Sequence, residues 1–320
     1  MPPQVTVAIP CYNAERWIGA AIRSALEQQD VTVEVIVVDD GSTDRSREKI
    51  RAITDRRVRF LEGSHCGANP ARNLALREAA GEWVQFLDAD DYLLPQKLAR
   101  QLRDGADTDV IYSPVIFDQD GAQTPSAMDS GRRLEALWLA WELPQTGGCL
   151  WRKERLQKLG GWNEATPCCQ EYELYARAIR AGLRFRFSPE PGAVYRVWSE
   201  GSLCRKDPLQ VVEVRTALFR DFVAWLRDRG DLREDERQLA GRAFFEMART
   251  TARYDLARAT RYHREHHRAG LIHATGPAAP ASYRAAYKLL GFSWAESFAR
   301  TLRGGKSETR NPKSETMSEK

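Results

Sequence analysis

The sequence predicts an α/β fold, with a doubly wound, mostly parallel sheet followed by a helical extension. Short runs rich in Val and Ile alternate with segments of helical spacing over the first hundred residues. The run at residues 33–38 is almost wholly apolar, as expected for a parallel strand covered on both faces. Aspartates follow this run and the run at residues 83–87, and ligands of doubly wound sheets bind beyond the carboxyl ends of the strands.

The first hundred residues follow a β-α-β-α-β-α-β order. Ser42 or Thr43 is suited to cap the second helix. Pro70 suits the first turn of the third helix, and Gly81 suits its end. The expected strands are residues 5–9, 33–38, 58–61 and 83–87, and the expected helices are residues 14–28, the segment from the Ser42 or Thr43 cap to about residue 53, and residues 69–79.

The second hundred residues are expected to complete the same domain. Residues 121–131 are rich in Gly, Ser and Pro, which is typical of a loop. Residues 147–151 are expected to be a turn that enters a strand. The remaining expected elements are strands at 109–117, 185–187 and 193–197 and helices at 132–143 and 170–181.

The sequence changes character at about residue 207. Leucines, phenylalanines and alanines then recur at helical spacing, so we expect a helical extension over residues 207–303. Residues 304–320 contain mostly polar and charged side chains and are expected to be a disordered tail. The α/β domain is therefore expected to span residues 1–206, with halves at 1–100 and 101–206.

Bulk properties narrow the classes of protein. The 320 residues are 42% hydrophobic and 29% charged, which is typical of a soluble protein with a sizeable core. A net charge of +4 is too small to indicate nucleic-acid binding. No N-terminal segment resembles a secretory signal and no apolar run is long enough to span a bilayer as a helix, so we expect a cytoplasmic protein. The six cysteines have no zinc spacing and are expected to be reduced thiols.

Three carboxylates, Asp88, Asp90 and Asp91, follow the apolar run at residues 83–87. Carboxylates at the exit of a buried strand are costly unless positive charge lies near them. Mg²⁺ and Mn²⁺ prefer oxygen ligands, and Mg²⁺ is often held by one or two carboxylates together with substrate phosphates. The motif therefore indicates a metal–diphosphate site, and a polar loop or helix cap without metal is the alternative.

A second pair of carboxylates, Asp39 and Asp40, follows the run at residues 33–38. The GxGxxG fingerprint is absent after the first strand, which disfavours a dinucleotide, and no GxxxxGK[ST] loop indicates an NTPase. A buried aspartate can accept a hydrogen bond from the N–H of a pyrimidine or guanine, and Tyr12 is suited to support the base. These residues indicate a different kind of nucleotide site.

Four motifs occur in a fixed order along the chain. They are Val-Ala-Ile-Pro-Cys-Tyr-Asn at residues 7–13, Val-Val-Asp-Asp-Gly-Ser-Thr-Asp at 37–44, the segment 67–73, and Gln-Phe-Leu-Asp-Ala-Asp-Asp at 85–91. Their order and spacing resemble those of the GT-A glycosyltransferases of family 2. The resemblance covers residues 4–205 and is most specific in the first hundred. It implies the nucleotide-diphospho-sugar transferase fold.

The resemblance also implies a set of nucleotide-binding residues. Pro10 and Tyr12 would line the nucleoside pocket, and Asp40 would bind the edge of the base. Arg72 would contact the nucleotide region, and Asp88 would face the ribose.

Asp90 is the implied metal ligand, and it would hold Mn²⁺ or Mg²⁺ against the diphosphate. Breaking a sugar–phosphate bond leaves negative charge on the nucleoside diphosphate. A bridging cation stabilises that leaving group.

Glu171 is the implied catalytic base. The segment Gln-Glu-Tyr-Glu-Leu at residues 170–174 resembles the family's acidic segment at the start of a helix, and Glu171 stands where relatives have Asp. It would deprotonate the acceptor hydroxyl, which then attacks the anomeric carbon and inverts it. Its side chain is one methylene longer, so its reach differs. Glu173 is the second choice, and a charged helix face is the alternative for both residues.

Three further residues are candidates for acceptor or phosphate contacts. Many relatives have His near the position of Trp198, and Trp cannot bind a metal. Arg196 could neutralise phosphate charge or simply snorkel from a strand edge. Trp162 could stack on an acceptor sugar or lie in the core.

Two features of the extension suggest weaker hypotheses. The histidines at 263, 266 and 267 match no zinc pattern and are expected to lie on a solvated basic face. Residues 283–303 mix aromatic, aliphatic and basic side chains. They are expected to pack against the α/β domain or a second subunit, and contact with a membrane surface beside a lipid-linked acceptor is the alternative.

The sequence therefore predicts an inverting, metal-dependent glycosyltransferase that moves a sugar from a nucleoside diphosphate to a hydroxyl of a glycan or lipid-linked acceptor, as in bacterial polysaccharide synthesis. A non-catalytic nucleotide-sugar or glycan-binding relative is the main alternative, followed by a nucleotidyltransferase. The sugar, the base, the acceptor and the oligomeric state are left open.

Overall fold

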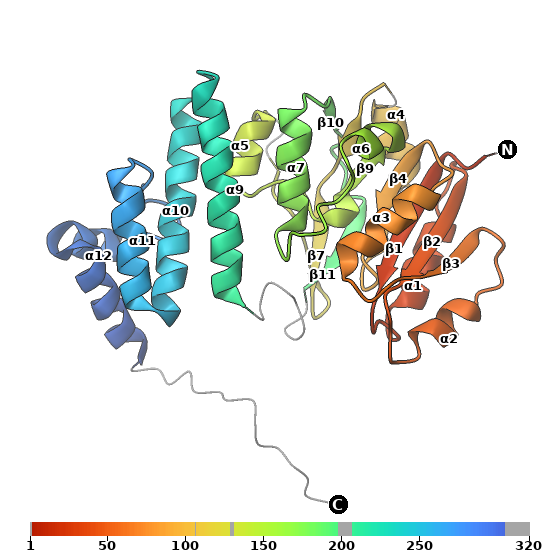
Figure 1. Ribbon diagram of the computed structural model, residues 1–320, viewed down its shortest axis with the longest axis horizontal. Helices are drawn as coiled ribbons and strands as arrows, with labels where there is room; N and C mark the ends of the chain where they lie inside the picture. Colours follow the sequence, from red (N-terminus) through yellow and green to blue (C-terminus); the bar gives the residue numbers. More distant parts are fainter. Residues whose placement is uncertain (1, 106, 129–130, 198–206, 305–320) are drawn as a thin grey trace, which may run out of the picture. The chain divides into compact units, whose positions relative to one another are not determined.

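The computed structural model describes residues 2–105, 107–128, 131–197 and 207–304 (Figure 1). The five cysteines within these ranges are reduced thiols, and Cys204 lies outside them. No helix in the described ranges is long and apolar enough to cross a membrane.

The chain divides into two units, residues 1–224 and 225–320. The boundary predicted after residue 206 lies before this division. Helix α9 (Pro208–Asp228) gives Phe219 and Phe222 to the first unit, where both rings pack against Trp138. Except for Gly304, which ends a helix, the predicted disordered tail lies outside the described residues.

A seven-stranded sheet forms the centre of the first unit. Its strands, in spatial order, are β10 (Phe185–Phe187), β6 (Val110–Tyr112), β9 (Cys149–Arg152), β4 (Trp83–Phe86), β1 (Val5–Cys11), β2 (Val33–Asp39) and β3 (Val58–Glu62). Neighbouring strands are parallel except where β9 pairs with β4 and β6. The predicted mostly parallel sheet is confirmed.

Helices between the strands cover the sheet. Alternate residues of β1 and β2 form one core cluster with the apolar face of α1 (Ile18–Leu26). Helix α3 (Ala68–Glu78) also packs on these two strands. Strands β2 and β3 lie on one side of β1, and β4 lies on its other side. The carboxyl ends of β1 and β4 therefore border a topological switch point, where ligands bind in such sheets.

The second helix is shorter than predicted. Helix α2 (Ser46–Arg51) begins after the expected caps. Ser42 Oγ instead accepts a hydrogen bond from the backbone N–H of Asn13 at 3.0 Å, and Asn13 Oδ1 accepts one from the backbone N–H of Thr43 at 2.8 Å. These polar residues join the loops after β1 and β2, so they shape the ligand-facing edge of the sheet.

A second, four-stranded sheet was not predicted. It contains, in order, β5 (Tyr92–Leu93), β11 (Ala193–Arg196), β7 (Val115–Gln119) and β8 (Ala122–Pro125). The strand predicted at 109–117 is two strands in different sheets, and the loop predicted at 121–131 contains β8. Asp120 and Gly121 both have positive φ and make the tight turn between β7 and β8.

The remaining helices of the first unit are α4 (Lys97–Gly105), α5 (Leu134–Leu139), α6 (Lys153–Lys158) and α7 (Gln170–Arg180). Lys97 is fully buried beside β4. Its ammonium group donates to Oε1 of Gln85 and to Oε1 of Gln101, both neutral acceptors. Burial lowers the pKa of Lys97 from 10.5 to about 7.

This buried amine predicts a pH dependence of stability. Above pH 7 the unfolded chain binds a proton at Lys97 that the folded protein does not. The free energy of unfolding should therefore rise with pH from about 7, by up to ~1.4 kcal/mol per pH unit. Replacing Lys97→Met should remove this slope, which denaturant unfolding between pH 7 and about 8 would measure, before thiols of the unfolded chain titrate at their usual pKa of about 8.5. Lys49→Met, at an exposed site, should keep the slope, and an unchanged slope in Lys97→Met would contradict the assignment.

The second unit contains α10 (Glu234–Tyr254), α11 (Leu256–Arg268) and α12 (Ala281–Gly304). The three histidines of α11 were predicted to lie on a solvated face, and this prediction is wrong for His263 and His266. His263 Nε2 lies 2.9 Å from the Tyr287 hydroxyl, and His266 Nδ1 donates to the Tyr262 carbonyl at 2.8 Å. Both rings are buried among aromatic side chains, and burial lowers the pKa of His263 to about 4. His267 is exposed.

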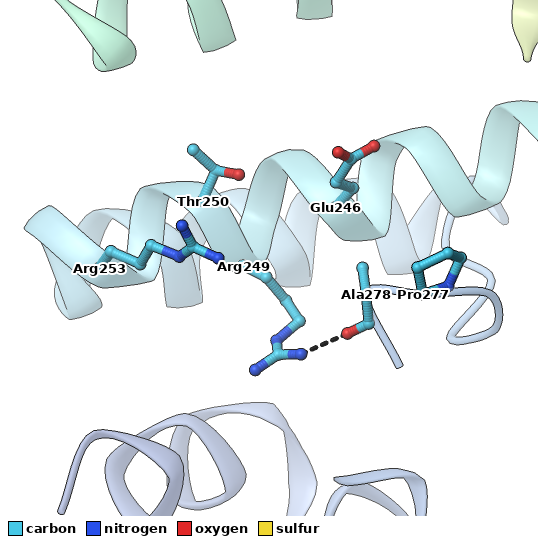
Figure 2. Close-up of a pocket in the computed structure, with 6 residues that line it drawn as sticks. All are labelled: Glu246, Arg249, Thr250, Arg253, Pro277 and Ala278. Carbon is cyan, nitrogen blue, oxygen red and sulfur yellow. Dashed lines mark hydrogen bonds between the residues drawn. The ribbon is translucent and has the colours of Figure 1, made fainter. Parts of the chain in front are cut away.

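Arg249 of α10 binds α12 and the loop that precedes it (Figure 2). It donates to Glu296 of α12 and to the carbonyl oxygen of Ala278, and its guanidinium lies 3.8 Å from the centre of the Tyr283 ring. A hollow of about 340 Å³ lies beside it, lined by Glu246, Arg249, Thr250, Arg253, Pro277 and Ala278. Because Arg249 already binds two partners, its structural role is to hold α12 and the preceding loop against α10.

Candidate functional site

The aspartate pair after β2 serves the loops around it. Asp39 is fully buried and binds Arg47 Nε at 2.6 Å. Asp40 is also buried, and its two carboxylate oxygens accept from the backbone N–H groups of Cys66 at 3.1 Å and Gly67 at 2.7 Å. Asp40 therefore holds the loop that enters α3, while each of its oxygens keeps a further lone pair for a ligand.

Tyr12 and His65 form an aromatic pair beside Asp40. Tyr12 is 51% exposed, and the two ring centres are 5.1 Å apart. His65 Nδ1 donates to the Asp40 carbonyl oxygen at 2.9 Å, which fixes the ring. Pro10, half-buried on β1, pairs with Val38 in the same region. His65 did not emerge from the sequence, because only its contacts with Asp40 and Tyr12 reveal it.

Arg72 connects the two halves of the first unit. It is buried and donates to Asp88 Oδ1 at 2.7 Å, to Gln170 Oε1 at 2.8 Å and to Asn69 Oδ1 at 3.0 Å. Asp88 follows β4 and Gln170 begins α7, so one guanidinium joins the half at residues 1–100 to the half that carries Glu171. This arrangement gives Arg72 a positioning role.

Trp162 was expected either to stack on a sugar or to lie in the core, and its side chain lies in the core. The ring is only 3% exposed, packs edge-on against Phe86 at 5.1 Å, and lies 4.5 Å from the Arg72 guanidinium. A sugar has no access to its face in this structure. Trp162 therefore packs against the Arg72 guanidinium and does not stack on an acceptor sugar.

Replacing Arg72→Met should destabilise the protein by about 3 kcal/mol, because Asp88 and Gln170 would lose a buried charged partner. Denaturant unfolding measures the change. Arg45→Met is the matched control, since the Arg45–Glu15 pair at 3.2 Å is exposed and should contribute little to stability. Equal losses in the two variants would contradict the role of Arg72.

Negative charge concentrates where β4 ends. Asp88 and Asp90 are half-buried, whereas Asp91 is buried and accepts from the backbone N–H of Arg196 at 2.8 Å. Burial raises the pKa of Asp91 well above its usual range, and the charges of Asp90 and Asp88 raise it further. Among the residues that the structure describes, no three carboxylate, His or Cys side chains form a ready cation site.

Glu171 stands in the first turn of α7, and its Oε1 accepts from the Thr146 hydroxyl at 2.5 Å. Glu173, the second choice, binds Arg177 at 2.8 Å and 2.9 Å instead. Arg177 also binds the carbonyl oxygens of Leu159 and Gly161, so Glu173 has a structural partner.

Tyr195 of β11 lies within range of the charges at the end of β4 and the start of α7. Burial raises the pKa of this phenol above its usual range, and the charges of four carboxylates raise it further. These are Asp88, Asp91, Glu171 and Asp90. Neither Tyr195 nor Thr146 carried a sequence signal.

Arg196 lies at the rim of this acidic group. One guanidinium nitrogen donates to the carbonyl oxygen of Asp90 at 2.5 Å, and the guanidinium lies between the rings of Trp17 (4.8 Å) and Tyr92 (4.7 Å). Its side chain is therefore held by neighbouring groups and brings positive charge close to the aspartates. Trp198 lies outside the described residues.

The chain is similar to known proteins at the level of sequence. A family model described as Glycosyl transferase family 2 matches residues 6–160. The succinoglycan biosynthesis protein ExoO of Rhizobium meliloti (strain 1021) is 31% identical over 241 residues, or 69% of this chain and 68% of ExoO. The Escherichia coli UDP-Glc:alpha-D-GlcNAc-diphosphoundecaprenol beta-1,3-glucosyltransferase WfgD is 40% identical over 99 residues, or 31% of this chain and 39% of WfgD.

Solved structures share the fold. Residues 1–349 of S. aureus TarS in complex with UDP-GlcNAc align with a TM-score of 0.61 and 17% identity, covering 95% of this chain and 93% of that one. The Pyrobaculum calidifontis mannosyltransferase PcManGT, in complex with GDP-Man and Mn²⁺, aligns with a TM-score of 0.58 and 21% identity, covering 96% and 88%. At these identities the similarity shows the fold alone.

Proposed function

The chain belongs to glycosyl transferase family 2, and we propose that it transfers a sugar from a nucleoside diphosphate to an acceptor hydroxyl with inversion at the anomeric carbon. The observation that carries this proposal is the Arg72 guanidinium, which binds Asp88 after β4 at 2.7 Å and Gln170, the neighbour of Glu171, at 2.8 Å, and so joins the two acidic segments. One carboxylate at this site can serve as a base, while others can hold a cation against the leaving diphosphate. A general base and positive charge at the leaving group both favour a displacement at the anomeric carbon.

Glu171 is the proposed base. Its carboxylate takes the proton of the acceptor hydroxyl while the acceptor oxygen forms a bond to the anomeric carbon. The bond from that carbon to the diphosphate oxygen breaks, and its electron pair leaves with the nucleoside diphosphate. The hydrogen bond from Thr146 to Oε1 holds the Glu171 side chain, which leaves Oε2 as the atom suited to receive the proton.

Tyr12, His65 and Asp40 form the proposed nucleoside end of the site. The exposed Tyr12 ring offers a face for the base, and Pro10 lies on the adjoining strand. The lone pairs that Asp40 keeps beside its two loop bonds would accept from a base N–H. Asp88, which Arg72 binds at 2.7 Å, would face the ribose.

A divalent cation, Mn²⁺ or Mg²⁺, fits the acidic group at the end of β4. Burial raises the pKa of Asp91 well above its usual range, and the charges of Asp90 and Asp88 raise it further; a cation would neutralise that charge. Because the described residues contain no cluster of three ligands, the cation would be held by Asp90 together with substrate phosphates. When bound, such an ion would stabilise charge on the leaving diphosphate.

The proposed acceptor is a glycan or a lipid-linked sugar of bacterial polysaccharide synthesis. Two relatives support this class, since one is named for succinoglycan biosynthesis and the other for a diphosphoundecaprenol-linked GlcNAc acceptor. The reaction would then take place at the cytoplasmic face of a membrane.

The test has two stages. The full chain is first heated with UDP, dTDP, GDP or CDP, each with and without Mn²⁺, because a ligand that binds only the folded state raises Tm. Sugar derivatives of the nucleotide that binds are then incubated with GlcNAc-diphosphate-lipid, and release of the nucleoside diphosphate is measured. Acceptor-dependent release is expected. Tm shifts without release for any sugar would contradict a transferase and favour a binding protein.

A further inference from the structure

Helix α12 exposes four large apolar side chains, Leu289, Leu290, Trp294 and Phe298, which we call the apolar patch. Leu289 is 83% exposed and Trp294 is 72% exposed. Gly291 interrupts the helix with φ 73° between the two leucines and the two aromatic residues. Trp294 and Phe298 are four residues apart and so share one face of the second segment.

The other side of α12 is already packed. Phe292 and Ala295 belong to the core of the second unit, together with Phe245 of α10. The helix therefore has buried side chains that attach it and exposed apolar side chains both before and after Gly291. Several large apolar side chains exposed along one helix are typical of an interaction site.

The charges around the apolar patch have one sign. Lys288 and Arg300 are exposed on α12, whereas Glu296, the only acidic residue of the helix, is buried against Arg249. Residues 256–304 contain eight Lys or Arg and two Glu, hence a formal charge of +6. The whole chain carries only +4, so its positive charge is concentrated in α11 and α12.

We propose that α12 docks the protein on an anionic lipid surface, with the apolar patch entering the acyl boundary and Lys288 and Arg300 meeting the lipid phosphates. An interfacial helix combines such an apolar face with flanking cations. A second copy of the chain fits less well, because face-to-face contact would bring Lys288 and Arg300 against their own equivalents.

Vesicle sedimentation of the full chain tests this proposal without any sugar donor. Vesicles of phosphatidylcholine alone are compared with equal parts of phosphatidylcholine and phosphatidylglycerol. We expect binding to the anionic vesicles that weakens with salt. Both Trp294→Ser/Phe298→Ser and Lys288→Glu/Arg300→Glu should lower the partition coefficient roughly tenfold or more, with Tm unchanged because these side chains are exposed.

Lys49→Glu/Arg56→Glu is the matched control, since it changes the net charge equally at two exposed sites of the first unit. It should bind vesicles nearly as well as the parent chain. Equal losses in the two charge variants would show non-specific attraction and overturn the proposal. So would absence of binding to anionic vesicles, or a dimer in sedimentation analysis that Trp294→Ser/Phe298→Ser abolishes.

Discussion

Replacing Glu171→Gln is expected to lower turnover by about 10²–10⁴-fold, the usual contribution of a general base. Glutamine has the same shape and can still accept from the Thr146 hydroxyl through its amide oxygen, but it cannot take a proton from the acceptor. The nucleoside end of the site is untouched. The Tm shift with the nucleoside diphosphate should therefore be retained while kcat falls, and initial-rate kinetics separate the two effects.

Glu173→Gln is the control for this prediction. It lies two residues away on α7 and has the same chemistry, but its carboxylate binds Arg177. We expect nearly normal turnover and some loss of stability from the weakened ion pair. Full activity in Glu171→Gln with a large loss of activity in Glu173→Gln would show that Glu173, and not Glu171, is the base. Glu171→Asp, the residue that the family resemblance predicts at this position, should keep part of the activity because it keeps a carboxylate.

Local patterns predicted the central part of the fold. Strands β1, β2 and β4 are mainly apolar and buried, and β3 contains Val58, Phe60 and Leu61, so short local patterns were enough to predict them. Because carboxyl ends of parallel strands meet at one edge, the sequence also placed Asp40 and Asp88 at the same edge of the sheet. Strand β8 was missed because its four residues are all exposed and show no alternation, although Asp-Gly before it is a hairpin signal.

The parts of the site that could not be predicted depend on contacts across the chain. Tyr195, Thr146 and His65 acquire their roles from neighbours that are distant in sequence. For the same reason the sequence could not show that Asp40 is already bonded to two loop amides. Trp162 reads equally as a sugar platform or a core residue until its burial is known.

Asp90→Asn is expected to lower turnover at least about 10²-fold and to remove the part of the nucleotide Tm shift that needs Mn²⁺, because a divalent cation contributes several kcal/mol at a leaving diphosphate. Asparagine preserves the size of the side chain and removes its charge. The carbonyl oxygen of Asp90 still accepts from Arg196, so the loop should keep its course. Thermal shifts with and without Mn²⁺ measure the binding effect separately from turnover.

Asp120→Asn makes the same chemical change in the turn between β7 and β8. Asparagine tolerates the positive φ of 52° found there, so both turnover and the Mn²⁺ effect should be unchanged. If Asp90→Asn instead kept its Mn²⁺-dependent shift, the cation would be held by other carboxylates. If neither the parent chain nor Asp90→Asn responded to Mn²⁺, the positive charge for the leaving diphosphate would have to come from the protein itself. Arg196 would supply it, since two aromatic rings hold it beside the acidic group.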